Sequence, residues 1–153
     1  MFGWFNKTDS TPAQERRGVE TVQYLVVRQD LNMSPGKMSA QSAHAASAIS
    51  LAHRGMIRHI QKSEHLNQFQ GAFLDWCETS FAKVVLRAKS ADALNKICRQ
   101  LEEEGIPYAP ILDACRTELT PEEEGGGVFT CIGVTPLYRD EVPKCLQKAQ
   151  LFH

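Results

Sequence analysis

The chain has little that would mark it as a secreted, membrane-spanning or metal-binding protein. Its first residues contain no apolar stretch of the kind found in signal peptides, and no apolar run approaches the roughly 18 residues that span a bilayer. Its five cysteines are odd in number and widely spaced, and none forms a Cys-x-x-Cys pair. We therefore expect reduced thiols in a cytoplasmic protein, with neither disulfides nor a zinc site.

An excess of charge of either sign is also missing. The formal net charge is −1, so no global basic field attracts nucleic acid, and any such partner must be held by a local patch. The 153 residues are 42% hydrophobic and 23% charged, which is ordinary for one soluble domain with one core. No internal repeat is visible. We predict a flexible tail over residues 1–20 and one domain over residues 21–153.

Strand and helix signals alternate along the chain. Segments rich in β-branched and aromatic residues predict strands at 22–28, 82–88, 108–112 and 128–134. Helices are predicted over 34–52, in one or two pieces within 54–76 with a break at Gly71, from Ser90 to a stop at Gly105, and over 140–150. Pro110 places the third strand at a sheet edge. This order predicts an α/β fold: a single three-layer domain with a four-stranded mixed β-sheet flanked by helices on both faces.

The helix over 34–52 carries the most informative pattern. Ser34 suits the N-cap, and Pro35 suits the first helical position because its missing N–H would be unpaired there. Lys37, Gln41 and His44 share one face, while small apolar residues form a second stripe suited to close packing on a sheet. The helix dipole opposes a cation in the first turn, so Lys37 hints at function, although an exposed lysine without a role fits equally well.

Polar residues follow the ends of two predicted strands, where sites of open α/β sheets gather. The first strand leads into Lys37 and Gln41. The third leads into Asp113, Arg116 and Thr117. Asp113 could act as a base or orient a lysine, Arg116 could bind phosphate, and Thr117 could hold a water or a carbonyl. A plain loop with an Asx turn explains the same residues, so the pattern alone does not define an activity.

Five segments in register resemble the archaeal and eukaryotic-type peptidyl-tRNA hydrolases, the type 2 family. They are residues 24–33, 36–46, Trp76 with 83–88, 113–121 and 130–136, and the resemblance covers residues 22–152. It implies a four-stranded mixed sheet with helices around it, and a cytoplasmic homodimer. The implied activity is hydrolysis of the ester that joins a peptide to the 3′ end of tRNA, with no cofactor and no metal.

The resemblance also implies roles for individual residues. The catalytic residues would be Lys37, Asp113, Thr117 and Thr130. The substrate would be bound by Gln41 and His44, to which we add Arg28 and Arg116 as candidates for tRNA phosphates.

Two departures from the family keep a second interpretation open. Cys115 replaces a glycine, and a cysteine would be strained if the position needs a positive φ. The loop between Thr117 and Thr130 is longer than in the family, and its glutamates would repel phosphate. The alternative is a tRNA- or protein-binding module of the same fold with weak or no turnover. Deacylation of another aminoacyl ester is a third interpretation.

Overall fold

The computed structural model describes residues 18–60, 66–122, 124 and 126–153, so most of the predicted tail lies outside it. The elements are β1 (Thr21–Arg28), α1 (Pro35–Ile60), α2 (Gln68–Glu78), β2 (Ala82–Ala88), α3 (Ala91–Glu103), β3 (Tyr108–Asp113), β4 (Val128–Val134), β5 (Leu137–Tyr138), the 3₁₀ helix η1 (Arg139–Glu141), α4 (Lys144–Gln147) and β6 (Gln150–Leu151).

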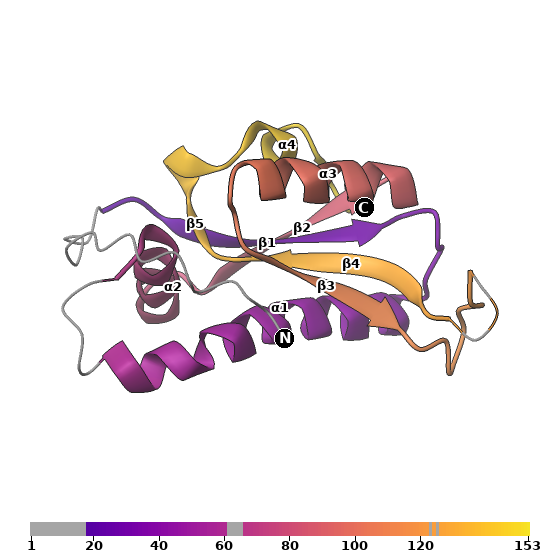
Figure 1. Cartoon of the computed structure of the whole chain (residues 1–153). Coiled ribbons are helices and arrows are strands. Elements are labelled where there is room, and N and C mark those ends of the chain that lie inside the picture. The colour runs from indigo at the N-terminus through magenta and orange to yellow at the C-terminus, as the bar shows by residue number, and fades with distance from the viewer. Residues whose placement is uncertain (1–17, 61–65, 123, 125) are drawn as a thin grey trace.

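The sheet is mixed, as predicted, but it has six strands and not four. Its order is β3-β4-β1-β2-β6, with β5 paired to β1 (Figure 1). The two unpredicted strands, β5 and β6, have two residues each, too few to show a periodicity. Strand β1 is parallel to β2, and β4 runs antiparallel between β1 and β3. The carboxyl ends of β1, β2 and β3 therefore lie at one edge of the sheet.

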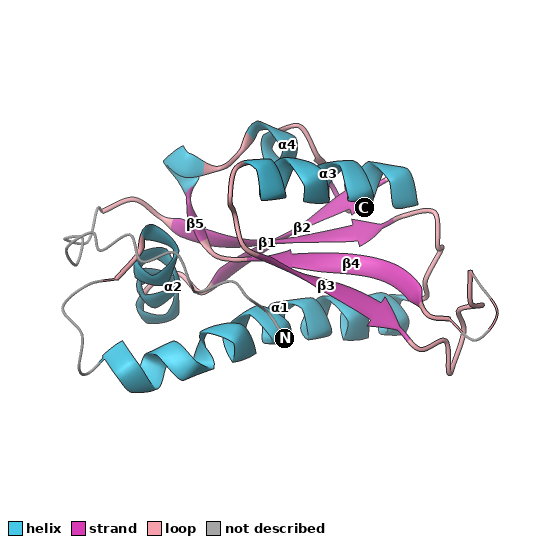
Figure 2. Ribbon diagram, in the orientation of Figure 1, coloured by secondary structure: helices cyan, strands magenta, loops and turns pink. Residues whose placement is uncertain are grey.

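Helices cover both faces of the sheet, which confirms the α/β architecture. Figure 2 shows α1 and α2 on one face and α3 and α4 on the other. The largest apolar cluster joins β1, β2 and β4 to α3 and α4. Two smaller clusters pack α1 and α2 against the opposite face. This burial fixes α1 beside the strand ends that carry the candidate site.

Close packing sets the position of α1. Ala45 of α1 is fully buried, and Gly133 of β4 faces it so closely that a Cβ at residue 133 would overlap the Ala45 carbonyl oxygen. The small-residue stripe therefore lets the helix lie directly on β4. At the start of α1 the Ser34 hydroxyl accepts a hydrogen bond from the Lys37 N–H at 3.2 Å, as an N-cap should.

Several local predictions are confirmed. Ser90 caps α3 by accepting a bond from the Ala93 N–H, and Gly105 follows its end with a φ of +67°. Strand β3, with Pro110, is an edge strand. The five cysteines are all free thiols.

Other boundaries are wrong. Helix α1 continues from 52 to Ile60, and Gly71 lies inside α2, where its N–H bonds the Asn67 carbonyl at 3.0 Å. The helix predicted over 140–150 is replaced by η1, the four-residue α4 and β6. Pro143 ends that pattern because it lacks the N–H that a continuous helix would need.

Two observations concern membrane-spanning helices and metal sites. No helix in the described part of the chain is both long and apolar enough to cross a bilayer. Within the same residues no three His, Cys, Asp or Glu side chains lie together as metal ligands would. His53 is buried against the Phe73 ring and bonds Thr135, a packing role, while the side chains of His59 and His65 lie outside the description.

Candidate active site

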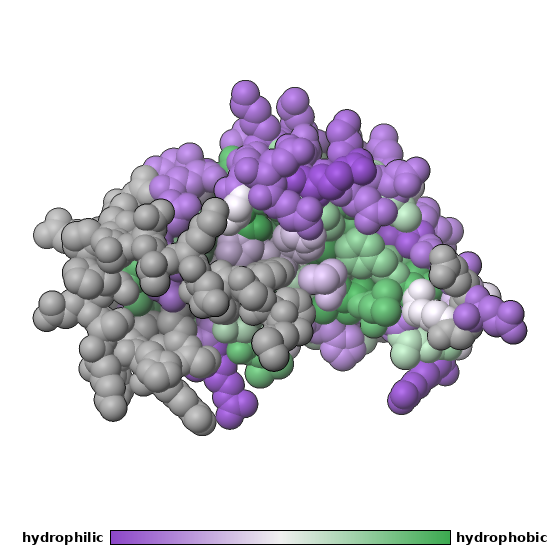
Figure 3. Space-filling view, in the orientation of Figure 1, coloured by the Kyte–Doolittle hydropathy of each residue, from purple (hydrophilic) through white to green (hydrophobic). Residues whose placement is uncertain are grey.

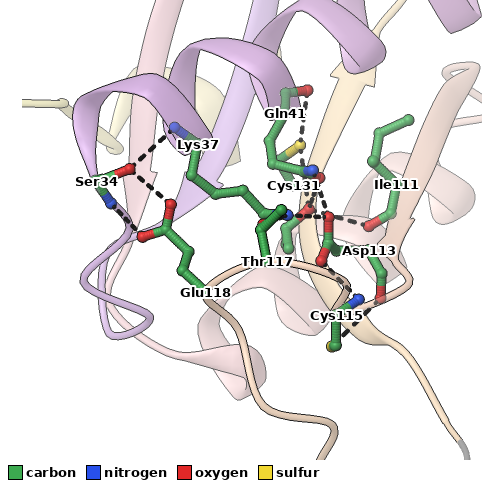
Figure 4. Close-up of polar contacts among 10 residues, drawn as sticks. Ser34, Lys37, Gln41, Ile111, Asp113, Cys115, Thr117, Glu118 and Cys131 are labelled. Atoms are coloured by element: carbon green, nitrogen blue, oxygen red, sulfur yellow. Dashed lines mark hydrogen bonds and ion pairs between the residues drawn. The ribbon is translucent and has the colours of Figure 1, made fainter.

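An ion pair between Lys37 and Asp113 forms the centre of the site (Figure 4). Lys37 comes from the first turns of α1 and Asp113 ends β3, so the pair joins the helix to the sheet edge. Lys37 Nζ lies 2.6 Å from Asp113 Oδ2, and the two side chains are only 11% and 9% exposed. Nζ also donates to Thr117 Oγ1 at 3.1 Å. The ammonium group is thus held by two partners, which leaves one of its three N–H groups for a substrate.

Two buried hydrogen bonds, which run from Thr130 through Gln41 to Asp113, hold the aspartate in place, and we call them the buried relay. Gln41 Nε2 donates to Asp113 Oδ2 at 2.7 Å, and Thr130 Oγ1 donates to Gln41 Oε1 at 2.6 Å. Gln41 is 2% exposed and Thr130 is fully buried. Gln41 lies one helical turn after Lys37, which is why both reach the same carboxylate. The Thr130 hydroxyl thus contacts Gln41 and is shielded from solvent.

The loop after β3 supplies the remaining contact of Asp113. The Cys115 N–H donates to Asp113 Oδ1 at 2.8 Å, which closes an Asx turn. Cys115 has a φ of +53°, so the position does adopt the positive φ at which a cysteine is strained. Burial raises the pKa of Asp113, but the Lys37 ammonium and the N–H donors of Cys115 and Gln41 outweigh it. The net effect lowers the pKa below its usual value, so Asp113 is ionised at neutral pH.

The acidic loop is tied to the domain at two points. The Glu118 carboxylate accepts hydrogen bonds from Ser34 N at 2.9 Å and Ser34 Oγ at 2.6 Å, at the start of α1. These bonds lower the pKa of Glu118, and its charge supplies the anion that the first turn of α1 lacks. Glu122 Oε1 pairs with Arg28 at 2.7 Å. Both carboxylates are thus engaged by the protein.

The structure brings together five of the eight predicted site residues: Lys37, Gln41, Asp113, Thr117 and Thr130. His44 is exposed on α1, about two turns beyond Lys37, and takes no part in the hydrogen bonds described above. Arg116 is exposed beside Thr117 and faces solvent.

Arg28 does not occupy the position that we expected. Its side chain is 4% exposed and forms ion pairs with Asp30 and Glu122, both at 2.7 Å, and a hydrogen bond to the Phe129 carbonyl. A guanidinium with these partners anchors the acidic loop and is not open to phosphate. The sequence shows a cation at the end of a strand but not its distant acidic partner Glu122, so it could not indicate these ion pairs.

The sequence analysis missed three features of the site: the hydrogen bonds between Ser34 and Glu118, the ion pair between Arg28 and Glu122, and the burial of Thr130. Alternation along β4 gave no signal for Thr130, because the pairing of β3 with β4 shifts register at this point: Thr130 contacts Gln41 of α1, whereas Ile132 packs in the cluster with α3 and α4. The two loop contacts join residues far apart in sequence, and spacing alone could not have found them.

Comparison with known proteins identifies the family of this domain. The sequence model of the family described as peptidyl-tRNA hydrolase PTH2 matches residues 21–152. A peptidyl-tRNA hydrolase of Methanococcus vannielii is 32% identical over 130 residues, covering 84% of this chain and 97% of its own. One from Sulfurisphaera tokodaii is 35% identical over 116 residues, covering 76% of this chain and 85% of its own.

These matches extend over nearly all of the domain that carries the site. The chain therefore belongs to the peptidyl-tRNA hydrolase PTH2 family.

Proposed function

We propose that this protein hydrolyses the ester between a peptide and the 3′ end of tRNA, releasing free tRNA and free peptide. Family membership supports the reaction, and the Lys37 ammonium held between Asp113 and Thr117 is the observation that carries it. A fixed cation with one N–H left over suits a developing oxyanion.

The reaction needs water as its only co-reactant. Water adds to the ester carbonyl, and the resulting oxyanion is stabilised by the remaining N–H of Lys37. Thr117 accepts from Lys37, so its own O–H remains to position the water or the carbonyl. Collapse of the intermediate breaks the bond to the ribose oxygen, which takes up the proton that the water loses.

Asp113 serves this chemistry better as an orienting group than as the general base. A general base works best with a pKa near the operating pH, and the pKa of Asp113 is lowered by Lys37, Cys115 and Gln41. We therefore expect no loss of kcat from protonation of Asp113 between pH 8 and about 5. A fall of kcat with an apparent pKa of about 6, abolished in Asp113→Asn, would assign the base to Asp113 instead.

We further propose that the protein is cytoplasmic, works as a homodimer and binds tRNA through a small basic surface. Arg116 is its best candidate because it is exposed beside Thr117. Two other cations of the domain are engaged: Arg139 pairs with Glu20, and Lys83 lies over the Trp76 and Phe81 rings. The proposed domain remains 21–153, preceded by a tail over 1–20, and light scattering of the purified chain would measure its mass.

A binding module without turnover is the second candidate. It is favoured by Cys115, which holds a conformation that suits glycine, and by the Lys37–Asp113 pair, which satisfies much of its own hydrogen bonding. Such a protein would bind tRNA through the same surface but leave the ester intact.

Turnover of peptidyl-tRNA by purified protein, free of other hydrolases, separates the two candidates. We expect wild-type turnover and a loss of about 100-fold or more in kcat for Lys37→Met, which keeps length but removes the charge. Lys96→Met, an exposed lysine on α3, is the matched control and should retain activity. Tight tRNA binding without any wild-type turnover would favour the binding module.

A further inference from the structure

An apolar groove lies beside the candidate site and has no role in the chemistry above. It encloses about 610 Å³ between α3 and strands β3 and β4. Pro110, Leu112 and Phe129 line the sheet side, and Asn95 and Arg99 line the helix side. Leu112 is 68% exposed, which is unusual for a leucine in a strand. Figure 3 shows hydrophobic atoms gathered below the polar surface of α3, over β3 and β4.

The groove and the active site lie on opposite faces of the sheet, at the same ends of β3 and β4. Leu112 directly precedes Asp113, and Phe129 directly precedes Thr130, so the groove and the site use adjacent residues of the same two strands. Alternation sends these side chains to opposite faces of the sheet. In the described part of the chain, β3 has a neighbouring strand on one side only, so no strand blocks the path around its outer edge. About three extended residues would cover a path of some 10 Å from one face to the other.

We propose that this groove holds the peptide part of the substrate, upstream of the residue whose ester is cleaved. The inference rests on the hydrolase function proposed above, which requires a substrate with two chemically different parts. The RNA part is anionic, and this groove is lined by one cation, Arg99, and one carboxylate, Glu102, so it offers no excess of positive charge. Apolar walls with a few polar groups suit a peptide, and continuity with Asp113 places the groove where that peptide must leave the ester.

Recognition in this groove uses side chains more than a main-chain ladder. An unpaired strand edge can bind an extended peptide by main-chain hydrogen bonds, but Pro110 has no N–H to donate in the middle of β3. Leu112 is then the main apolar contact. The protein should therefore prefer tRNA carrying several apolar residues over tRNA carrying a single acylated amino acid.

Two substrates measured side by side test the proposal. One is tRNA esterified with an N-acetylated tetrapeptide of leucine, and the other is N-acetyl-leucyl-tRNA, whose short chain does not reach the groove. For Leu112→Ser we expect kcat/KM to fall about tenfold on the tetrapeptide substrate and to stay unchanged on the short one. Leu112→Met should restore the tetrapeptide value. Asn95→Trp, which fills the groove from α3, should repeat the loss.

Leu51→Ser is the matched control, because Leu51 is 62% exposed on α1 and lies outside the groove. Its kcat/KM should equal that of the wild type on both substrates. Equal effects of Leu112→Ser on both substrates, or none on either, would overturn the peptide role while leaving the hydrolase function in place. Failure of the wild type to cleave either substrate would overturn the function, and the groove's role with it. A dimer that Leu112→Ser converts to monomer, with unchanged substrate preference, would assign the groove to a second copy of the chain.

Discussion

Thr130→Val tests whether the buried relay supports the active site. Valine has nearly the shape of threonine and favours a strand, so the change removes one hydroxyl and little else. Loss of the hydroxyl removes the donor that lies 2.6 Å from Gln41 Oε1, and Gln41 is only 2% exposed, so water cannot replace that donor. An unsatisfied buried acceptor costs about 1–3 kcal/mol. For a chain of this size that corresponds to a fall in Tm of roughly 2–10 °C.

The folded variant should also have a lower kcat, which a loss of stability alone would not cause. Gln41 holds Asp113, which holds Lys37, so a looser Gln41 should lower kcat about tenfold while KM for peptidyl-tRNA changes little. Thr135→Val is the matched control. Thr135 is equally buried and bonds His53 at 3.1 Å outside this relay. It should cost similar stability and leave kcat unchanged, so equal kcat values for the two folded variants would refute the relay.

Four further substitutions test separate parts of the structure. Gly133→Ala should destabilise the protein by about 1–3 kcal/mol in urea unfolding because its Cβ would overlap α1, whereas Gly71→Ala, which meets nothing within 4 Å, should be neutral or stabilise α2 by up to about 1 kcal/mol. Cys115→Gly should stabilise by up to about 1 kcal/mol in the same assay because it relieves the positive φ, and an unchanged midpoint would argue against strain there. Arg116→Ala should weaken tRNA binding and reduce the slope of log K against log salt by about one unit, and an unchanged slope would exclude a phosphate contact.

The sequence predicted the parts of this molecule that local patterns determine. Four strands, the caps at Ser34 and Ser90, and the stop at Gly105 are each specified by residues within a few positions. The two-residue strands β5 and β6 escaped because two residues are too few to show a periodicity. The C-terminal helix was wrong because its apolar spacing was interrupted by Pro143, whose effect on a helix outweighs periodicity.

The same division holds for the candidate site. Resemblance identified Lys37, Asp113, Thr117 and Thr130, and the structure places them in one connected network. Arg28 could not be placed from sequence because its environment depends on Glu122, which is 94 residues away. A charge at a strand end has the same local pattern whether it faces solvent or anchors a loop.

Asp113→Asn tests the central claim most directly, because asparagine keeps the size of the side chain and removes its charge. If Asp113 fixes the Lys37 ammonium for the reaction, peptidyl-tRNA hydrolysis should fall by about two orders of magnitude or more. The affinity for tRNA, measured on the same folded sample, should hold or rise slightly because a negative charge is lost. Turnover by Asp113→Asn equal to that of the wild type would contradict the account, since Lys37 and Thr117 would then act without their carboxylate.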